Sequence, residues 1–480
     1  MIRESNRRKI SAGVALLGLA FILSGCAAFS PDGGMETVKD IASTRIEGSV
    51  VALRSEADAI AARETVTRLL KRPLTARTAV QIALLNNREL QAAYNALGIQ
   101  EAIRVQASLP PNPVFSLSRV AGGGEIEIER QIVANILALA TLPARADVAA
   151  DRFRQAQLMA AGETVRIALE TRRAYHRAVA ARQLAGFFRE AETAAQAAVE
   201  LAKRLGETGA INKLDQARQQ VFYAELATQL AANARQAEIE RERLIRAMGL
   251  WGGDLAFRLP SALPALPSRP RHLATVEVEA VGRRIDLQMA RLEASALAKS
   301  YGLTSATRFV NLLEVAGISK TTKLADGRRL NERGIAVEFE VPLFDFGEVR
   351  VRQAEATYMR AINLLMAKAV NARSEAREAY HSYRAAYDIA RHYRREIVPL
   401  RSIISEEMLL RYNAMQIDVF ALLAEARQRI TSSIAAIEAE RDFWIADTNL
   451  ALAVVGGSAS PSSDMTGGIA MSANAPAGGH

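Results

Sequence analysis

The sequence contains a single cysteine, Cys26, and few aromatic residues, which make up 5% of the chain. One thiol excludes an internal disulfide. Half of the residues are apolar, while glycine and proline are few and clustered. This composition is typical of long uninterrupted helices and argues against a mixed globular core.

Signatures of catalysis and of metal binding are missing from the sequence. No phosphate loop, zinc pattern, nucleophile elbow or kinase signature occurs. Of the five histidines, His381 and His392 are eleven residues apart, which is too far along a helix for one metal ion. His176 and His381 occupy matching positions in the repeat described below, which favours packing or surface roles. We therefore expect no enzyme, no cofactor and no metal site.

Basic residues outnumber acidic ones, and the formal net charge is +9. Part of the excess lies in the first nine residues, at Arg3, Arg7, Arg8 and Lys9. Beyond them, acidic and basic residues intersperse as i, i+3 and i, i+4 neighbours without a block of like charge. This pattern indicates solvated helix faces, so we expect no nucleic-acid partner.

Residues 1–25 have the parts of an export signal. A basic start precedes an apolar run at residues 12–23 that is too short to span a bilayer. The run ends in Leu23-Ser24-Gly25-Cys26, which resembles the lipobox of bacterial lipoproteins, whose cysteine becomes the lipidated N-terminus. Ala27 is not the aspartate associated with inner-membrane retention, so we expect an outer-membrane anchor at Cys26. The alternative is a chance cysteine behind an ordinary signal.

The remainder of the chain contains an internal repeat. Four short matches recur in order, at offsets from 197 to 205 residues. They pair residues 86–91 with 283–288, 173–176 with 378–381, 214–215 with 417–418, and 252–253 with 456–457. The expected divisions are a signal peptide (1–25), an anchor and lead-in segment (26–73), a first repeat (74–259), a proline-rich linker (260–271), a second repeat (272–457) and a disordered tail (458–480).

Each repeat is expected to begin with a helix and a β-hairpin. In the first repeat Thr75 would cap a helix over residues 76–108, which the prolines from Pro110 onward end. Alternation of apolar and polar residues then predicts two strands per repeat. The expected strands are residues 114–120, 125–129, 307–315 and 335–343, joined by loops at 121–124 and roughly 317–333.

The strands have one apolar and one polar face. The apolar set includes Ile126, Ile128, Val337 and Phe339, and the acidic set is Glu125, Glu127, Glu129, Glu338 and Glu340. If the first set faces lipid, the second faces a lumen, which predicts a pore that prefers cations. Four strands cannot close a barrel alone, and open edges are not tolerated in lipid, so oligomerisation would have to close it. The alternative is a small soluble sheet packed on helices.

Long helices complete each repeat. Residues 144–204 contain no proline, and about 60 residues at 1.5 Å each predict roughly 90 Å of helix. Residues 346–412 are similar, with a kink or junction expected at Pro399. Tight breaks at 206–209 and 412–415 predict antiparallel hairpins that must pack sideways on something. A plain coiled-coil stalk would also satisfy this pattern.

Several motifs in order resemble the TolC-like outer-membrane factors of bacterial tripartite efflux and type I secretion systems. They are residues 74–97 (LTARTAVQIALLNNRELQAAYNAL), 109–113 (LPPNP), 341–347 (VPLFDFG) and the break from Arg411-Tyr412 to Asp418-Val419. The VPLFDFG stretch, where strand passes to helix, is the most specific. The resemblance spans about residues 74–457.

The resemblance implies a homotrimer. Three chains of four strands would form a twelve-strand barrel in the outer membrane, and their helical hairpins would form an α-barrel through the periplasm. Such a duct is passive, and it receives solutes from an inner-membrane pump through a periplasmic adaptor. The expected fold class is therefore mainly α with a small β part and internal duplication.

The family's gate and adaptor-docking surface lie at the hairpin tips. The resemblance places Gly209, Asp215, Tyr412 and Asp418 there. Asp418 would form an acidic ring under threefold symmetry, and Asp215 can pair with a basic residue of the second hairpin. The chain departs from the pattern because its second break is about two residues shorter, no Arg or Lys lies between Tyr412 and Asp418, and Ala421 replaces a second gate aspartate. Each aspartate could instead be a helix N-cap or first-turn acid.

Two alternatives to the duct remain open. A coiled-coil lipoprotein with a structural or adaptor role would make no pore, and it would have no need for lipid-compatible hairpins. An exported enzyme lacks any candidate group of residues. The transported substrate cannot be read from the sequence, although the acidic residues favour cations slightly.

Overall fold

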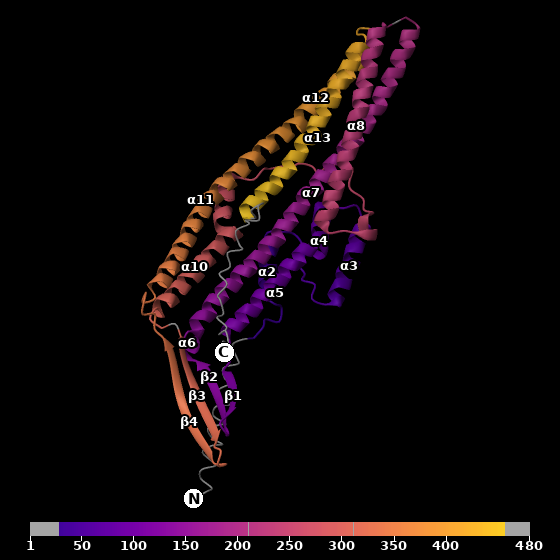
Figure 1. The fold of residues 1–480 in the computed structure, drawn as a ribbon. Coiled ribbons are helices and arrows are strands. Elements are labelled where there is room, and N and C mark those ends of the chain that lie inside the picture. The colour runs from indigo at the N-terminus through magenta and orange to yellow at the C-terminus, as the bar shows by residue number, and fades with distance from the viewer. Residues whose placement is uncertain (1–27, 210, 311, 457–480) are drawn as a thin grey trace.

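The chain forms an elongated helical body with a small β-sheet at one end and two hairpin tips at the other (Figure 1). The structure, a computed structural model, describes residues 28–209, 211–310 and 312–456. Cys26 and the tail from residue 458 lie outside the described residues.

From the helix that begins at Ala76 in the first half and the helix that begins at Leu273 in the second, the main elements follow the same order. The first half contains α2 (Met35–Ser43), α3 (Glu56–Leu70), α4 (Ala76–Asn86), α5 (Arg88–Ser108), β1 (Val114–Gly122), β2 (Glu125–Asn135), α6 (Ile136–Ala140), α7 (Leu142–Glu207) and α8 (Lys213–Met248). After the 3₁₀ turn η2 (Gly252–Leu255), the second half contains α9 (Leu273–Arg283), α10 (Ile285–Ala306), β3 (Leu312–Lys323), β4 (Arg329–Glu340), α11 (Glu348–His392), the π-helical turn η3 (Tyr393–Ile397), α12 (Val398–Asn413) and α13 (Val419–Val455). The pairs α4/α5 and α9/α10 each lead through a β-hairpin to long helices, which confirms the duplication, while α2 and α3 precede the first repeat.

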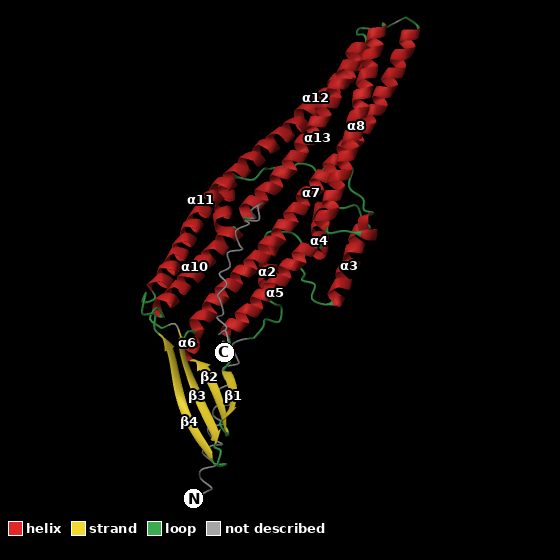
Figure 2. Ribbon diagram, viewed as in Figure 1, coloured by secondary structure: helices red, strands yellow, loops and turns green. Residues whose placement is uncertain are grey.

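The four strands form one antiparallel sheet in the order β1-β2-β3-β4 (Figure 2). The hairpin of the first repeat lies beside that of the second, with Glu127 opposite Thr322 across the β2–β3 boundary. Strands β1 and β4 are the two edges, and within the described chain neither edge pairs with a further strand.

The predicted strands of the second repeat were partly wrong. The segment expected as strand 307–315 begins only at Leu312, and most of the expected loop 317–333 is strand, which leaves residues 324–328 as the turn. Its run of Ser, Lys and Thr alternates between the two faces of the sheet, so its polarity does not signal a loop. The last strand ends at Glu340 instead of residue 343, because Pro342 has no N–H to donate to a ladder.

The predicted helix 76–108 begins behind its N-cap Thr75 and ends at Ser108 as expected, but Asn87 divides it into two helices. Asn87 leaves helical geometry, with a ψ of 121°, and its side chain caps α5 by accepting from the Leu90 amide at 3.2 Å. Arg284, the repeat equivalent of Asn87, has nearly the same backbone conformation between α9 and α10. The break is therefore a feature of the repeat that helical periodicity alone does not reveal.

The long helices agree with the prediction and extend it. Helix α7 has 66 residues, which corresponds to about 100 Å at 1.5 Å per residue. The expected junction at Pro399 is confirmed, since α11 passes into α12 through η3 directly before that proline. Among the described residues, none of the helices combines the length and apolar character needed to cross a bilayer.

The core lies in the middle of the body, where the short helices pack on the long ones. Near the N-terminus Met35, Val38 and Ala42 of α2 are buried against α7. In the second half Tyr383 of α11 and Phe443 of α13 are buried against α9. The segment before the first repeat is thus part of the packed body, and its apolar side chains help to fix the position of α7.

Candidate channel wall and helical tips

The sheet gathers its acidic side chains on one face. The register places Glu129 opposite Lys320 and Glu332, and Glu314 opposite Glu338, so these residues share one face. We call this the acidic face. It also carries the predicted lumenal residues Glu127, Glu129, Glu338 and Glu340. The structure thus brings all four onto one surface, with Glu125 at its end.

The sequence reasoning missed three charged members of the acidic face. Glu314, Lys320 and Glu332 lie in the segment that was expected to be strand end and loop. Lys320 forms an ion pair with Glu127 at 2.7 Å and so offsets part of the acidic charge. Correct strand limits would have found them, because the period-two pattern continues through this segment.

The opposite face is apolar near the helices. Phe115, Ile132 and Ile335 lie in one row across the sheet, and Val337 lies in the next. Ile335 and Phe339 are 80% and 62% exposed in the single chain. Large exposed apolar side chains in a continuous patch indicate a surface that is covered in the assembled protein.

Both hairpin tips lie at the end of the body remote from the sheet (Figure 1). The first tip turns at Gly209, which is exposed and has a φ of +75°. Asp215 follows in the first turn of α8, where it accepts from Asn212 at 2.8 Å and pairs with Arg218 at 3.1 Å. Both partners belong to the same hairpin, so within this chain Asp215 makes a local contact and does not bridge to the second hairpin.

The second tip is built around Asp418 and Tyr412. Asp418 is exposed and is the N-cap of α13, with its carboxylate accepting from the Ala421 amide at 2.8 Å. Tyr412 lies at the end of α12, and its carbonyl accepts from the Met415 amide at 3.0 Å. Met415 has a φ of +57° and is 94% exposed. The tip therefore presents one acid and one apolar side chain to solvent.

An arginine that the sequence did not single out joins the two hairpins. Arg427 of α13 donates to the Arg218 carbonyl at 3.3 Å and to the Gln219 amide oxygen at 3.2 Å, both on α8. Its guanidinium also lies 4.2 Å from the centre of the Phe222 ring. These contacts hold α13 against α8 below the tips. No local motif marks Arg427, because its partners are about 200 residues away.

A buried acid joins the two repeats near the sheet. Asp151 of α7 is bonded to Lys299 at 2.5 Å and to Ser295 at 3.2 Å, both on α10. Burial raises the pKa of Asp151, but the bonds to Lys299 and Ser295 and the nearby Arg154 outweigh it, so the pKa lies below its usual value. The ionised pair fixes α10 beside α7, directly above the strands.

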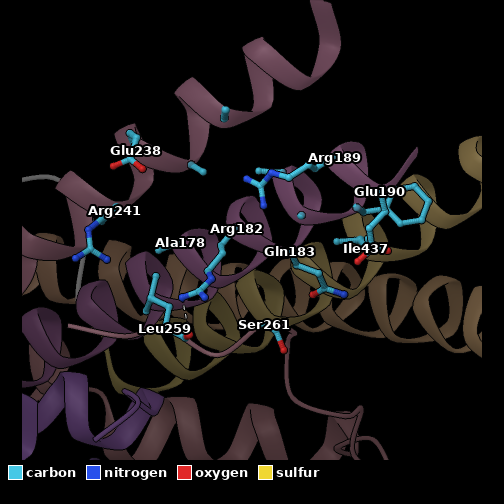
Figure 3. Close-up of a pocket in the computed structure, with 15 residues that line it drawn as sticks. Ala178, Arg182, Gln183, Arg189, Glu190, Glu238, Arg241, Leu259, Ser261 and Ile437 are labelled. Carbon is cyan, nitrogen blue, oxygen red and sulfur yellow. Dashed lines mark hydrogen bonds between the residues drawn. The ribbon is translucent and has the colours of Figure 1, made fainter. Parts of the chain in front are cut away.

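A hollow on the helical body lies beside the start of the linker between the repeats. It has a volume of about 670 Å³ and lies between α7, α8 and residues 259–261 (Figure 3). Arg182 donates to the Leu259 carbonyl at 2.7 Å, and Arg241 stacks on Phe257 at 4.1 Å. Both arginines thus hold the segment that leads into the linker. In the part of the chain that the structure describes, no group of three or more His, Cys, Asp or Glu residues could hold a metal ion.

The comparisons with known proteins agree with this geometry. Residues 277–406 match the family model described as "Outer membrane efflux protein". No curated protein matches the chain.

Solved structures match over most of the chain. CusC, whose structures concern folding and transmembrane channel formation, is 15% identical with a TM-score of 0.66, over 80% of this chain and 92% of its own. The outer-membrane channel OprN is 18% identical with a TM-score of 0.65, over 90% of this chain and 97% of its own. The Campylobacter jejuni outer-membrane channel CmeC is 16% identical with a TM-score of 0.64, over 82% and 86%.

The fold is therefore that of the outer-membrane channels, with long helical hairpins on a four-stranded antiparallel sheet. Residues 277–406, within the second repeat, are thus similar to the outer membrane efflux protein family. Together these findings confirm the resemblance to the TolC-like outer-membrane efflux factors.

Proposed function

We propose that this chain is the outer-membrane exit duct of a tripartite efflux or type I secretion system. The observation that carries the proposal is the two-faced sheet with two unpaired edges, at the end of a helical body about 100 Å long. An apolar sheet face suits lipid, an acidic face suits water, and the free edges require partner strands.

Three copies would meet these requirements. Edge strand β1 of one subunit would pair with β4 of the next, which gives a closed barrel of twelve strands. The helical hairpins would then pack on those of the neighbouring subunits and continue the duct through the periplasm. Exposed apolar residues along α11, such as Val349, Met366 and Val370, support such lateral packing.

The hairpin tips would form the periplasmic gate and the surface for a periplasmic adaptor, which links the duct to an inner-membrane pump. Asp418 would form a ring of three like charges that crowd when the tips meet. The contacts of Arg427 with α8 support a closed arrangement in which the two hairpins of one subunit are held together. The gate would open when these contacts are exchanged for contacts with the adaptor.

Lipidation at Cys26 would add a tether to a protein that its barrel already holds in the membrane. The basic and apolar leader followed by the lipobox supports this step. The tether would therefore assist targeting and assembly more than retention. The first residues of the described chain would lie close to the outer membrane, with the body extending into the periplasm.

Reconstitution of the detergent-extracted protein tests the function. The expected result is a particle of three chains that gives discrete single-channel currents in a planar bilayer. The second candidate, a coiled-coil lipoprotein, predicts that the chain without its anchor is a water-soluble monomer and conducts no current. That outcome would exclude the duct.

A further inference from the structure

The face of the sheet opposite the acidic face is apolar near the helices, but it carries basic residues near the hairpin turns. Five basic residues lie there in three successive rows of one face, and all of them are exposed. They are Arg119, Arg130, Lys323, Arg329 and Arg333, and we call them the basic belt. The register places Arg130 in line with Arg333 through Ser319, and Lys323 opposite Arg329.

The basic belt is uncompensated within the chain. Among the described residues, none of its five members takes part in an ion pair. By contrast, Arg328 in the turn pairs with Asp326, and Lys320 on the acidic face pairs with Glu127. The acids at the same level, such as Glu129 and Glu332, all lie on the other side of the sheet. Apart from Lys320, charge of opposite sign is thus segregated between the two faces.

The position of the belt matches a lipid headgroup layer. On the same face, apolar residues run from Phe339 to Ile335, and the belt begins at Arg333. The six residue steps from Phe339 to Arg333, at about 3.3 Å each, span roughly 20 Å along the strand. Beyond the strand, toward α11, Leu343 and Phe344 are further exposed apolar residues. The total approaches the apolar band of about 25 Å that outer-membrane barrels present to lipid.

Closing the barrel would concentrate this charge. Arg119 lies on edge strand β1, whereas Arg329 and Arg333 lie on edge strand β4. Pairing of β1 with β4 of the next subunit would bring arginines from two subunits to each seam. Like charges at that spacing repel unless an anion lies between them, and guanidinium groups bind phosphate with paired hydrogen bonds.

We propose that the basic belt binds the phosphate groups of a phosphorylated glycolipid in the outer leaflet, with its acyl chains on the apolar rows below. The inference rests on the proposed barrel, because the duct orients this face toward lipid. The hairpin turns are farthest from the helical body (Figure 1), so the belt would lie on the outer side of the membrane.

Binding of diphosphorylated lipid A to the detergent-solubilised full-length protein tests the proposal, with enzymatically dephosphorylated lipid A for comparison. Native mass spectrometry counts the lipids bound to each trimer. We expect the phosphorylated lipid to bind at least about tenfold more tightly, which corresponds to about 1.4 kcal/mol. The variant R119Q/R130Q/R333Q should lose this preference, and the matched control R328Q should keep it.

Equal binding of the two lipids to the wild-type protein would overturn the proposal, and so would an unchanged preference in the triple variant. Full displacement of the lipid by millimolar inorganic phosphate would also overturn it, because that result indicates a free-phosphate site. If the triple variant does not assemble, the test rests on two measurements: the preference of the single variant R333Q, which should be reduced, and the preference of the wild-type protein for the phosphorylated lipid. Single-channel currents are recorded from the same preparations. Currents without a lipid preference would contradict the lipid site alone, whereas absence of currents would contradict the duct.

Discussion

At the scale of the residue, His176 shows how burial keeps a histidine neutral and thereby makes the stability of the fold depend on pH. Its ring stacks on Trp444 of α13 with centroids 5.1 Å apart, and it is 3% exposed. Burial, with a smaller contribution from Arg172, lowers the pKa of His176 to about 4. The histidine is therefore neutral in the folded protein at pH 7 and packs as an aromatic ring.

The depressed pKa predicts a loss of stability in mild acid. Above the usual pKa of 6.5 neither state is protonated, and as pH falls toward 4 only the unfolded chain takes up the proton. The free energy of unfolding should fall through this window by up to about 3 kcal/mol. Thermal unfolding followed by circular dichroism should show H176Q with a flatter dependence on pH between 7 and 4. H381Q, at the exposed repeat equivalent, should keep the wild-type slope, and equal slopes for all three proteins would refute the assignment.

Arg427 gives a second prediction at this scale. Two hydrogen bonds to α8 and the contact with Phe222 together contribute about 1–3 kcal/mol to the closed arrangement of the hairpins. R427A should therefore raise the fraction of time that reconstituted channels spend open by about tenfold. Arg429 is a matched control, since no hydrogen bond or ion pair of its side chain occurs among the described residues. An unchanged open fraction in R427A would contradict the role of the contact.

The local sequence predicts the role of a residue whose partners are near in the chain. It does not predict the role of a residue whose partners are distant in the chain. Asp418 was expected either at a gate or as an N-cap, and the structure has it capping α13. Its role in a gate stays a proposal. Arg427 and Asp151 could not be predicted, because their partners come from other helices.

At the scale of the element, the junction after β4 depends on a glycine. Gly347 has a φ of +72°, and an added Cβ would lie 2.1 Å from the carbonyl oxygen of Arg308. That oxygen belongs to the backbone after α10, so it cannot move aside cheaply. The VPLFDFG motif thus has two structural roles: it turns the chain into α11, and its glycine lets the backbone pass close to Arg308.

Substitution of Gly347 should therefore be costly. G347A combines left-handed backbone strain with this collision, and we expect it to lower the free energy of unfolding by about 1–3 kcal/mol. Thermal unfolding and the yield of detergent-extracted protein would measure the loss. G302A is the control, because nothing lies within 4 Å of a Cβ added inside α10. It should be neutral or stabilising by up to about 1 kcal/mol.

The helices and strands were predicted correctly where the sequence follows a single helical or strand periodicity. Helix α7 and the turn before Pro399 followed from long uninterrupted helical sequence and one proline. The break at Asn87 was missed because the apolar pattern continues through it, and it is fixed by tertiary contact with Gly249, whose carbonyl accepts from Asn86 at 2.5 Å. Strand β3 was misplaced because its half-buried run of polar residues resembles the sequence of a loop.

At the scale of the whole molecule, the acidic face predicts the ion preference of the pore. Three copies of Glu338 and Glu340 would surround one lumen, where crowded carboxylates attract cations. Under a salt gradient the reversal potential should indicate cation preference. E338Q/E340Q should reduce that preference severalfold, whereas E348Q, at the start of α11, should leave it unchanged. Anion preference in the wild-type channel, or no effect of the double substitution, would contradict this reading of the face.

The central claim is that edge strands β1 and β4 meet between subunits. Neighbouring strands lie about 4.8 Å apart, within the distance that a disulfide spans. Cysteines placed together at Ser116 or Ser118 in β1 and at Gly334 or Ala336 in β4 sample the possible registers. The controls are the variants that carry only one of the two new cysteines. The native Cys26 is present in every variant, paired or single.

The most direct measurement is oxidation of these paired variants in isolated outer membranes, followed by denaturing electrophoresis. We predict that at least one pair gives covalently linked trimers, because three seams close the ring, and that the single cysteines do not. Absence of cross-links at every pair in a chain that has reached the outer membrane, or dimers that never proceed to trimers, would contradict the account.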